Sequence, residues 1–438
     1  MDFTEGLSYR RILIFWAPLA LTWFMMAIEQ PILLAIIARL EEIKNNLAAF
    51  GIAASFAMIV EAPIIMLMSA STALVKGRHS YRKLRQFTNI LNAGITAIQL
   101  FLIIPPVFRF IVTGLMGIPA DVAELAHVAL IIFIPWAASI GYRRFYQGIL
   151  IRNNLTRRVT WGTLIRLSVI VITGLILFSA GVKGAYVGAA ALSLAVLVEA
   201  IATRIMTESA IEAVLKKEDS ENGSLSLKSV FRFYYPLALT SILSLGVAPF
   251  VTFFLGRSRL AVESLAVLPV VNSLVFIFRS PGLSYQETTI ALIGPEKQNY
   301  RILRNFAVYM GLTVTLLICM IAFTPLADLW FIDVSGLSDE LAGLAYLPLK
   351  IMVFFPAMTV LLNFQRALLV VNGTTLPVSV ATALELAGII VVLIICIFFL
   401  NLAGVVAAAV ALIAGRAVSN LYLLPKQEAA VKRWILIQ

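Results

Sequence analysis

The five-residue stretch PLALT fills positions 18–22 and returns at positions 236–240, an offset of 218 residues (236 minus 18). The same offset aligns three further pairs: Pro31 with Pro249, Arg39 with Arg257 and Pro63 with Pro281. A proline restrains the backbone and removes a hydrogen-bond donor, so prolines at matching positions indicate a shared backbone structure and not only similar hydrophobicity. The match therefore predicts that the second half of the chain repeats the fold of the first.

The composition is that of a membrane protein. Hydrophobic residues make up 61% of the chain, charged residues only 13%, and the mean hydropathy is +0.96. About twelve apolar runs reach the roughly 20 residues that a membrane-spanning helix needs. They cover residues 11–39, 46–75, 86–115, 123–150, 160–181, 184–207, 229–256, 261–290, 303–327, 341–369, 376–400 and 402–424. We therefore predict an all-α integral membrane protein.

A polar stretch separates the first six runs from the last six. Residues 216–228 are charged, rich in serine and without an apolar face, which is typical of a linker. The sequence thus predicts an N-terminal lobe at 1–215, a cytoplasmic linker at 216–228, and a C-terminal lobe at 229–438 that ends in a short cytoplasmic tail. Because six is an even number, both repeats enter the membrane in the same direction. This predicts a pseudo-two-fold axis along the membrane normal that relates two six-helix lobes.

Lysine and arginine gather at alternate ends of the runs. Arg78, Arg152 and Arg301 belong to these basic ends, whereas Asp121 and Asp328 lie at the opposite ends. By the positive-inside rule the basic ends are cytoplasmic, so we expect a multi-pass protein of the cell membrane with both termini in the cytoplasm. The excess of positive charge, +11 in total, lies in loops, where it sets the orientation of the protein in the membrane and does not indicate nucleic-acid binding. We expect membrane lipids and a small-molecule substrate as partners, and a monomer.

Six prolines within the runs form three pairs. They are Pro31 with Pro249, Pro63 with Pro281, and Pro135 with Pro356. A proline removes one backbone hydrogen bond and bends a helix, so these positions are candidate hinges. The alternative is that they only shape helix packing, as transmembrane prolines commonly do.

Ionisable residues deep in apolar runs are the candidate functional residues, because each is costly in lipid and should face a cavity or a partner. Four lie near the middle of their runs: Glu29, Glu61, Arg279 and Glu385. Four lie nearer the cytoplasmic ends of their runs: Arg166, Glu199, Arg366 and Arg416. Lys350 lies towards the outer end of its run. Long side chains near the ends of runs can reach the membrane surface, which favours a structural role for these.

Glu61 and Arg279 are related by the repeat, since 279 minus 61 is again 218. The two lobes thus carry opposite charges at equivalent depth. We predict a salt bridge or substrate clamp between them that forms in one access state and breaks in the other. The alternative is that each charge is satisfied within its own lobe.

Several short stretches resemble the progressive ankylosis protein family. They are Glu29-Gln30, Leu47-Ala48 with Phe50-Gly51, residues 235–239 and 249–251, and above all Pro348-Leu349-Lys350-Ile351 with Phe354-Phe355-Pro356. That family is related to the multidrug and toxic-compound extrusion (MATE) transporters and lipid flippases, within the MOP exporter superfamily. The resemblance covers nearly the whole chain and implies export of organic anions such as citrate, nucleotides or pyrophosphate.

The charged residues fit such an activity. Arg279, Lys350 and Arg366 could neutralise carboxylate or phosphate groups. Glu29, with Gln30 and Glu385, is the candidate for coupling to H⁺ or Na⁺, because a carboxyl group in a low-dielectric cavity can exchange a proton or hold a cation. We therefore expect a secondary active transporter that exports small organic anions by alternating access. A cation or multidrug antiporter and a lipid-linked precursor flippase remain alternatives.

An enzyme is not expected. The sequence holds only two histidines, His79 and His127, and shows neither the Cys/His spacing of a metal site nor a phosphate-cradling glycine motif. We expect no catalytic residue, no metal site and no cofactor other than a coupling ion.

Overall fold

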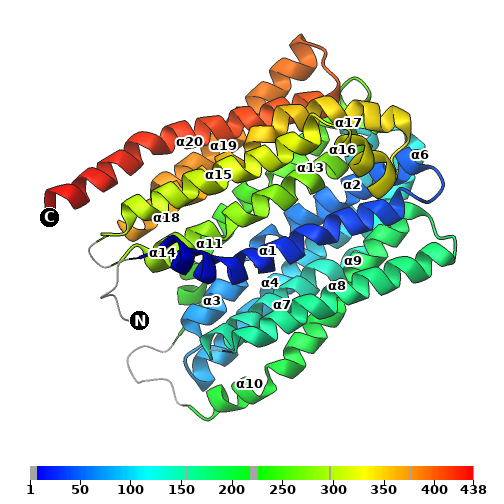
Figure 1. Ribbon diagram of the computed structural model, residues 1–438. Coiled ribbons are helices and arrows are strands. Elements are labelled where there is room, and N and C mark those ends of the chain that lie inside the picture. Colours follow the sequence, from blue (N-terminus) through cyan, green and yellow to red (C-terminus); the bar gives the residue numbers. More distant parts are fainter. Residues whose placement is uncertain (1–6, 154, 218–224, 295–296, 375, 438) are drawn as a thin grey trace. The chain divides into compact units, whose positions relative to one another are not determined.

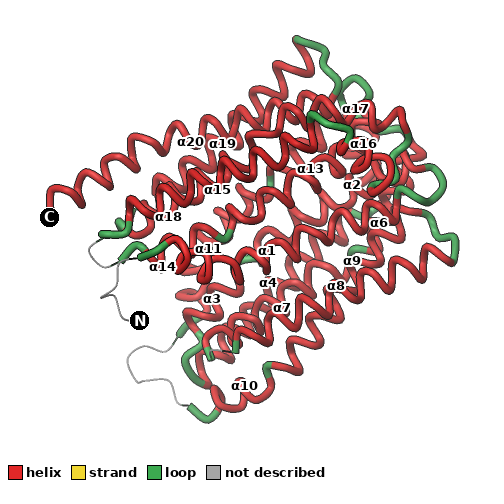
Figure 2. Tube along the Cα trace, in the orientation of Figure 1, coloured by secondary structure: helices red, strands yellow, loops and turns green. Residues whose placement is uncertain are grey.

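The structure is a computed structural model that describes residues 7–153, 155–217, 225–294, 297–374 and 376–437. Among these residues the regular secondary structure is helical and is joined by turns and loops, with no β-strand and one isolated bridge between Arg259 and Ala403 (Figure 2). Eleven helical segments are long and apolar enough to cross a membrane. The count is twelve if the bent pair Arg78–Leu102 and Pro105–Leu115, which meet at 71°, forms one span. The predicted all-α, multi-span fold is confirmed.

The chain divides into two compact units, which we call the central unit (Ile36–Arg257) and the terminal unit (Met1–Ala35 with Ser258–Gln438). The helices of the central unit are α2 (Ile43–Glu61), α3 (Leu67–Leu74), α4 (Arg78–Leu102), α5 (Pro105–Arg109), α6 (Ala120–Ile132), α7 (Ile134–Arg152), α8 (Thr156–Ser179), α9 (Gly184–Met206), α10 (Glu208–Leu215), α11 (Leu227–Leu245) and α12 (Val247–Gly256). The helices of the terminal unit are α1 (Tyr9–Ile37), α13 (Ala261–Leu283), α14 (Tyr285–Leu292), α15 (Tyr300–Ala322), α16 (Leu326–Asp328), α17 (Asp339–Ile351), α18 (Phe355–Val371), α19 (Leu376–Ile394) and α20 (Gly404–Ile437) (Figure 1).

Irregular backbone features recur at the register of the repeat. Glu42 and Leu260 both have a positive φ, of 50° and 54°, and Gly117 and Gly336 both have a φ of 74°. Residues 110–115 and 329–334 both form a π-helical turn. A left-handed φ is unfavourable for glutamate and leucine, so its recurrence reflects a shared backbone course and not shared hydrophobicity.

The first helix of each half packs with the other half of the chain. In the terminal unit, Trp16 of α1 donates its indole N–H to the carbonyl of Pro281, at 3.1 Å. In the central unit, Tyr234 of α11 donates its hydroxyl to the carbonyl of Pro63. The two contacts are equivalent, because the offset of 218 carries Trp16 onto Tyr234 and Pro63 onto Pro281. The units therefore differ from the predicted lobes 1–215 and 229–438 in the placement of these first helices.

The candidate hinge prolines lie mostly where helices are interrupted. Pro63 lies in a 3₁₀ turn between α2 and α3, and Pro249 lies in the first turn of α12, just after the break between α11 and α12. Pro135 and Pro356 lie at the starts of α7 and α18. Pro281 is close to the end of α13, whereas α1 continues through Pro31. Their role as hinges stays a prediction.

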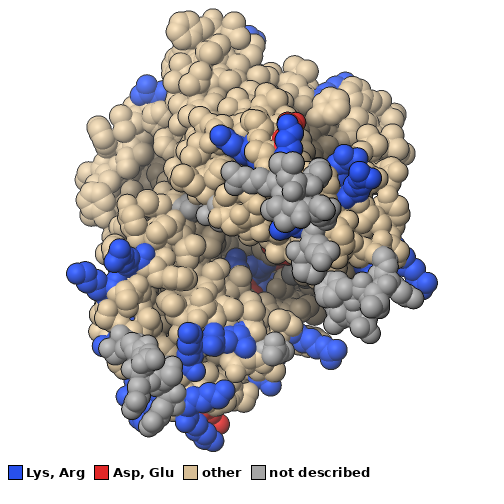
Figure 3. Space-filling view, turned by 90° about the vertical axis from the view of Figure 1, so that its left-hand side faces the viewer, with Lys and Arg blue, Asp and Glu red and all other residues tan. Residues whose placement is uncertain are grey.

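Basic side chains gather at one set of helix ends. Figure 3 shows a face on which Lys and Arg side chains greatly exceed Asp and Glu. In the terminal unit, α1 begins and α20 ends on the same side (Figure 1). An even number of spans requires that the first helix begins and the last helix ends on the same side. The cytoplasmic orientation of that side stays a prediction. The predicted linker 216–228 falls partly on residues 218–224, which lie outside the described residues.

Close packing between α3 and α7 depends on Gly148. A Cβ atom at this position would lie 2.4 Å from the carbonyl oxygen of Met68 and 2.6 Å from Cβ of Ser71. The two helices are also joined by hydrogen bonds from Ser71 Oγ to the carbonyl of Phe145, at 2.8 Å, and from Thr72 Oγ1 to the carbonyl of Gly148, at 3.2 Å. Replacement of this glycine must separate the helices.

We expect Gly148→Ala to lower the stability of the central unit by about 1–3 kcal/mol, because overpacking at a helix crossing forces the backbone to shift. Gly94→Ala is the matched control, since a Cβ there meets nothing within 4 Å. The control should be neutral or slightly stabilising, because alanine is the better helix former. The measurement is the midpoint of thermal unfolding in detergent, and equal midpoints for the two variants would contradict the prediction.

Candidate functional site

Two glycines allow α19 and α20 to approach closely. A Cβ atom on Gly415 would lie 2.5 Å from Cγ1 of Ile389 and 2.7 Å from the carbonyl oxygen of Glu385, and a Cβ on Gly388 would lie 3.4 Å from Cα of Gly415. The helices run side by side along α19 (Figures 1 and 2). The residue after Gly415 is thereby placed against Glu385.

Arg416 and Glu385 form a buried ion pair. Arg416 Nη2 lies 2.8 Å and Nε 2.9 Å from Oε1 of Glu385, and the two side chains are 8% and 11% exposed. An ion pair removed from water is held by its mutual attraction against a large desolvation cost. Loss of either partner would leave an uncompensated charge in the interior.

A second arginine shares the surroundings of Arg416. Arg279 Nε donates to Oγ1 of Thr359 at 3.2 Å, and Arg416 Nη1 donates to the same oxygen at 2.9 Å. Both guanidinium groups also lie over the ring of Phe355, with Cζ atoms 4.4 and 4.7 Å from its centroid. Thr359 gives its own proton to the carbonyl of Phe355, at 2.9 Å. Two cations therefore share one hydroxyl group and one aromatic face.

Arg366 of α18, the helix that also carries Thr359, adds a third guanidinium group. Its Nη2 donates to Oγ1 of Thr382 at 3.0 Å, and its buried Nε has no hydrogen-bond partner in the described structure. Thr382 lies three residues before Glu385 on α19, so the two side chains share a face of the helix. We call Arg279, Arg366, Arg416, Glu385 and Thr359 the terminal cluster. It holds three arginines and one carboxylate.

The central unit contains a second buried cluster on α7, α8 and α9. Glu199, 1% exposed, pairs with Nη1 of Arg143 and lies 3.6 Å from Nε of Arg166. Gln147 Nε2 donates to Oε1 of Glu199 at 3.3 Å. One carboxylate thus receives two guanidinium groups and an amide.

Arg144 and Glu61 complete this group. Arg144 has a buried Nε without a hydrogen-bond partner in the described structure, and its Nη1 reaches only the sulfur of Met68, at 3.8 Å. Glu61 accepts a hydrogen bond of 2.6 Å from the indole N–H of Trp136 and interacts electrostatically with Arg143 and Arg144. We call Arg143, Arg144, Arg166, Glu199 and Glu61 the central cluster. Here three arginines face two carboxylates.

Two positions that the repeat relates carry opposite charges in the two clusters. Glu61 corresponds to Arg279 at an offset of 218, and Arg166 of α8 corresponds to Glu385 of α19 at an offset of 219. Their partners lie on the next helices, where Glu199 of α9 faces Arg166 and Arg416 of α20 faces Glu385. The duplicated fold therefore keeps the ion pair and reverses its polarity.

The structure brings together some of the predicted site residues. Arg279, Arg366 and Glu385 belong to the terminal cluster. Lys350 does not: its side chain is exposed, with Nζ 5.7 Å from the ring centroid of Phe323. Glu29 is buried in α1, and its neighbour Gln30 is half-buried. The roles of these residues stay predictions.

The proposed contact between Glu61 and Arg279 also stays a prediction. Each has partners within its own unit, Trp136 for Glu61 and Thr359 for Arg279. Sequence reasoning missed Arg143 and Arg144, although two consecutive arginines within the apolar run 123–150 were a signal. It also favoured a side chain of Arg416 that reaches the membrane surface, whereas the side chain turns into the core of its unit.

Comparisons with known proteins identify the fold. No family model matches the sequence, and no curated protein matches it. Among solved structures, the chain is similar to an inward-facing multidrug resistance MATE family transporter of the MOP superfamily, with a TM-score of 0.70, 17% identity, and coverage of 95% of this chain and 99% of the other. It is also similar to the lipid II flippase MurJ in an inward closed conformation, with a TM-score of 0.69, 15% identity, and coverage of 96% and 92%.

A third match is a MOP superfamily transporter from Pyrococcus furiosus, with a TM-score of 0.59, 15% identity, and coverage of 97% and 99%. The reverse polarity of its binding pocket is described as suggesting a different function for that protein. Together the matches show that this chain has the fold of MATE and other MOP superfamily transporters. The resemblance to the progressive ankylosis family in particular stays a prediction.

We expect Glu385→Gln to destabilise the protein by about 3 kcal/mol, because it leaves Arg416 buried without its counter-charge. The double variant Glu385→Gln/Arg416→Gln should recover part of this loss, since both charges are then removed. The midpoint of thermal unfolding measures both effects. Glu340→Gln, which makes the same change at an exposed position of α17, is the control and should have no effect. A double variant less stable than Glu385→Gln would argue against a paired charge.

Proposed function

We propose that this protein is a secondary active transporter that exports small organic anions by alternating access. The observation that carries the proposal is the surplus of guanidinium groups in the terminal cluster, where Arg279 and Arg416 share Thr359 and Phe355 beside a single carboxylate. A fold common to MATE and MOP superfamily transporters supports the transporter class.

The cluster suits a carboxylate or phosphate group. Guanidinium groups bind such anions through two parallel hydrogen bonds, and stacking on Phe355 holds two of the planes in place. The unpartnered Nε of Arg366 offers a further donor, and a buried donor without an acceptor is costly. A bound anion would satisfy this donor and offset the repulsion between the arginines.

Glu385 has a defined part in this scheme. In the absence of substrate it balances Arg416, so the cluster is not left with three uncompensated charges. An incoming anion competes with Glu385 for Arg416. Citrate, nucleotides and pyrophosphate, the substrates that the family resemblance implies, all carry more than one anionic group and could bind two arginines at once.

A cation or multidrug antiporter is a weaker candidate. Such a protein would hold its substrate with carboxylates, yet Glu385 and Glu199 are both paired with arginines. Glu29, with Gln30 and Glu385, stays the candidate for binding a coupling H⁺ or Na⁺. A lipid-linked precursor flippase is the second alternative, favoured by the structural likeness to the lipid II flippase MurJ.

The test is uptake of labelled citrate into proteoliposomes, with pyrophosphate, ATP and an organic cation such as ethidium as competitors. We expect the anions to compete and ethidium not to. Arg279→Gln should reduce transport about tenfold or more, the effect of losing a charge-assisted hydrogen bond, while Arg279→Lys should retain part of it. Arg301→Gln, an exposed arginine outside the cluster, is the matched control.

Three results would count against the proposal. Ethidium transport that survives Arg279→Gln would favour the cation antiporter. Wild-type rates of citrate uptake in both Arg279→Gln and Arg366→Gln would remove the cluster from the binding site. Movement of a labelled lipid-linked precursor, without competition by citrate, would favour the flippase.

A further inference from the structure

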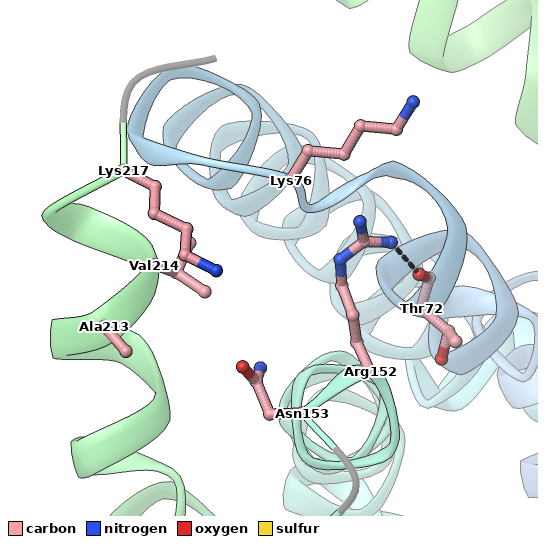
Figure 4. Close-up of a pocket in the computed structure, with 7 residues that line it drawn as sticks. All are labelled: Thr72, Lys76, Arg152, Asn153, Ala213, Val214 and Lys217. Carbon is pink, nitrogen blue, oxygen red and sulfur yellow. Dashed lines mark hydrogen bonds between the residues drawn. The ribbon is translucent and has the colours of Figure 1, made fainter. Parts of the chain in front are cut away.

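A second basic site lies in the central unit, at the end of α7. A cavity of about 480 Å³ opens between α10, the end of α7 and the turn from α3 to α4 (Figure 4). The residues that line it are Thr72, Lys76, Arg152, Asn153, Ala213, Val214 and Lys217. Three of these are cationic and none is acidic. None of them belongs to either buried cluster.

Backbone groups hold the guanidinium group of Arg152 and the main chain of Lys217 in place. Arg152 Nη1 donates to the carbonyl of Thr72 at 2.8 Å and to that of Ala73 at 3.5 Å, the last carbonyls of α3. The amide N–H of Arg78 donates to the carbonyl of Lys217 at 2.9 Å, which ties the second residue after α10 to the start of α4. Arg152 thereby stands on the edge of the cavity with further N–H donors available.

The helix that forms one wall is firmly packed. Ala210, Ile211 and Val214 of α10 are buried in the same apolar cluster as Ile149 of α7. In Figure 4 the ammonium group of Lys217 and the amide of Asn153 point towards the space between α10 and Arg152, while the side chain of Lys76 extends away from these three residues. The cavity is therefore a formed pocket with donors on opposite sides.

We propose that this pocket binds a phosphate group, carried either by the headgroup of an anionic lipid or by a small soluble phosphate. Three cationic residues from three separate segments line the pocket, and none of the described residues that line it is acidic. An arginine held by backbone carbonyls can still bind phosphate with its remaining donors. Thr72, Ala213 and Val214 are small enough to leave room for the group.

The position of the pocket suits a lipid. It lies where α3 and α7 end, among the basic helix ends that the positive-inside rule assigns to the cytoplasm. Anionic lipids are concentrated in that leaflet, and basic pockets between helices at this level bind their headgroups.

The test measures stabilisation of the full-length protein in detergent by phosphatidic acid, phosphatidylcholine or inorganic phosphate at constant ionic strength. We expect phosphatidic acid to raise the midpoint of thermal unfolding and phosphatidylcholine not to. Lys76→Gln/Lys217→Gln should weaken phosphatidic acid binding roughly thirtyfold, the effect of two cations near an anionic headgroup. Lys216→Gln, an exposed lysine beside Lys217 that does not line the pocket, is the matched control.

A second variant tests the pocket from its other wall. Ala213→Glu places a carboxylate at an exposed position of α10 that lines the cavity, and it should also abolish the shift. Stabilisation by inorganic phosphate equal to that by phosphatidic acid would identify a soluble phosphate as the ligand. No shift with either probe, or an equal loss of binding in Lys216→Gln, would overturn the proposal.

Discussion

In each unit, one hydrogen bond to a proline carbonyl joins the unit to a helix from the opposite half of the chain. Trp16 reaches Pro281 and Tyr234 reaches Pro63, in positions that the duplication relates. Backbone carbonyls near an interrupted helix need donors when no water is at hand. Trp16 and Tyr234 each supply one, and the carbonyl of Pro281 also accepts from the hydroxyl of Ser284. Glu61 and Arg279 each lie two residues before one of these prolines. The contacts that close the units therefore also place the charges whose polarity differs between them.

The inverted ion pairs show how a duplicated fold can keep its packing and change its chemistry. A carboxylate and a guanidinium group pair between α8 and α9, and another such pair lies between α19 and α20. In both units the attraction within the pair offsets the desolvation cost of the buried charges. The arginines in excess of these pairs differ in their surroundings. In the terminal cluster the excess Arg279 shares a hydroxyl group and a ring with the paired Arg416, whereas in the central cluster Glu61 supplies a second carboxylate. The terminal cluster is thus the one with the greater need of an external anion.

Sequence reasoning predicted the features that depend on length and register. Runs of about 20 apolar residues and an offset of 218 were enough for an all-α fold of about twelve spans and for the pairing of Pro63 with Pro281. The offset could not predict which half α1 packs against, because a repeat defines equivalence and not contact. The pair of Arg416 and Glu385 depends on the close crossing at Gly388 and Gly415, which only three-dimensional structure displays. Lys350 was placed in the site through its motif, yet its side chain is exposed.

The exchange of first helices also fixes an order of assembly. During synthesis α1 leaves the ribosome before any of the residues it packs against, whereas every helix of the central unit has been made once Arg257 is complete. The central unit can therefore close first, while α1 waits in the membrane for α13 and α15. Neither half of the chain, cut at residues 216–228, contains all the helices of either unit. Each unit is therefore completed only by a helix from the other half of the chain.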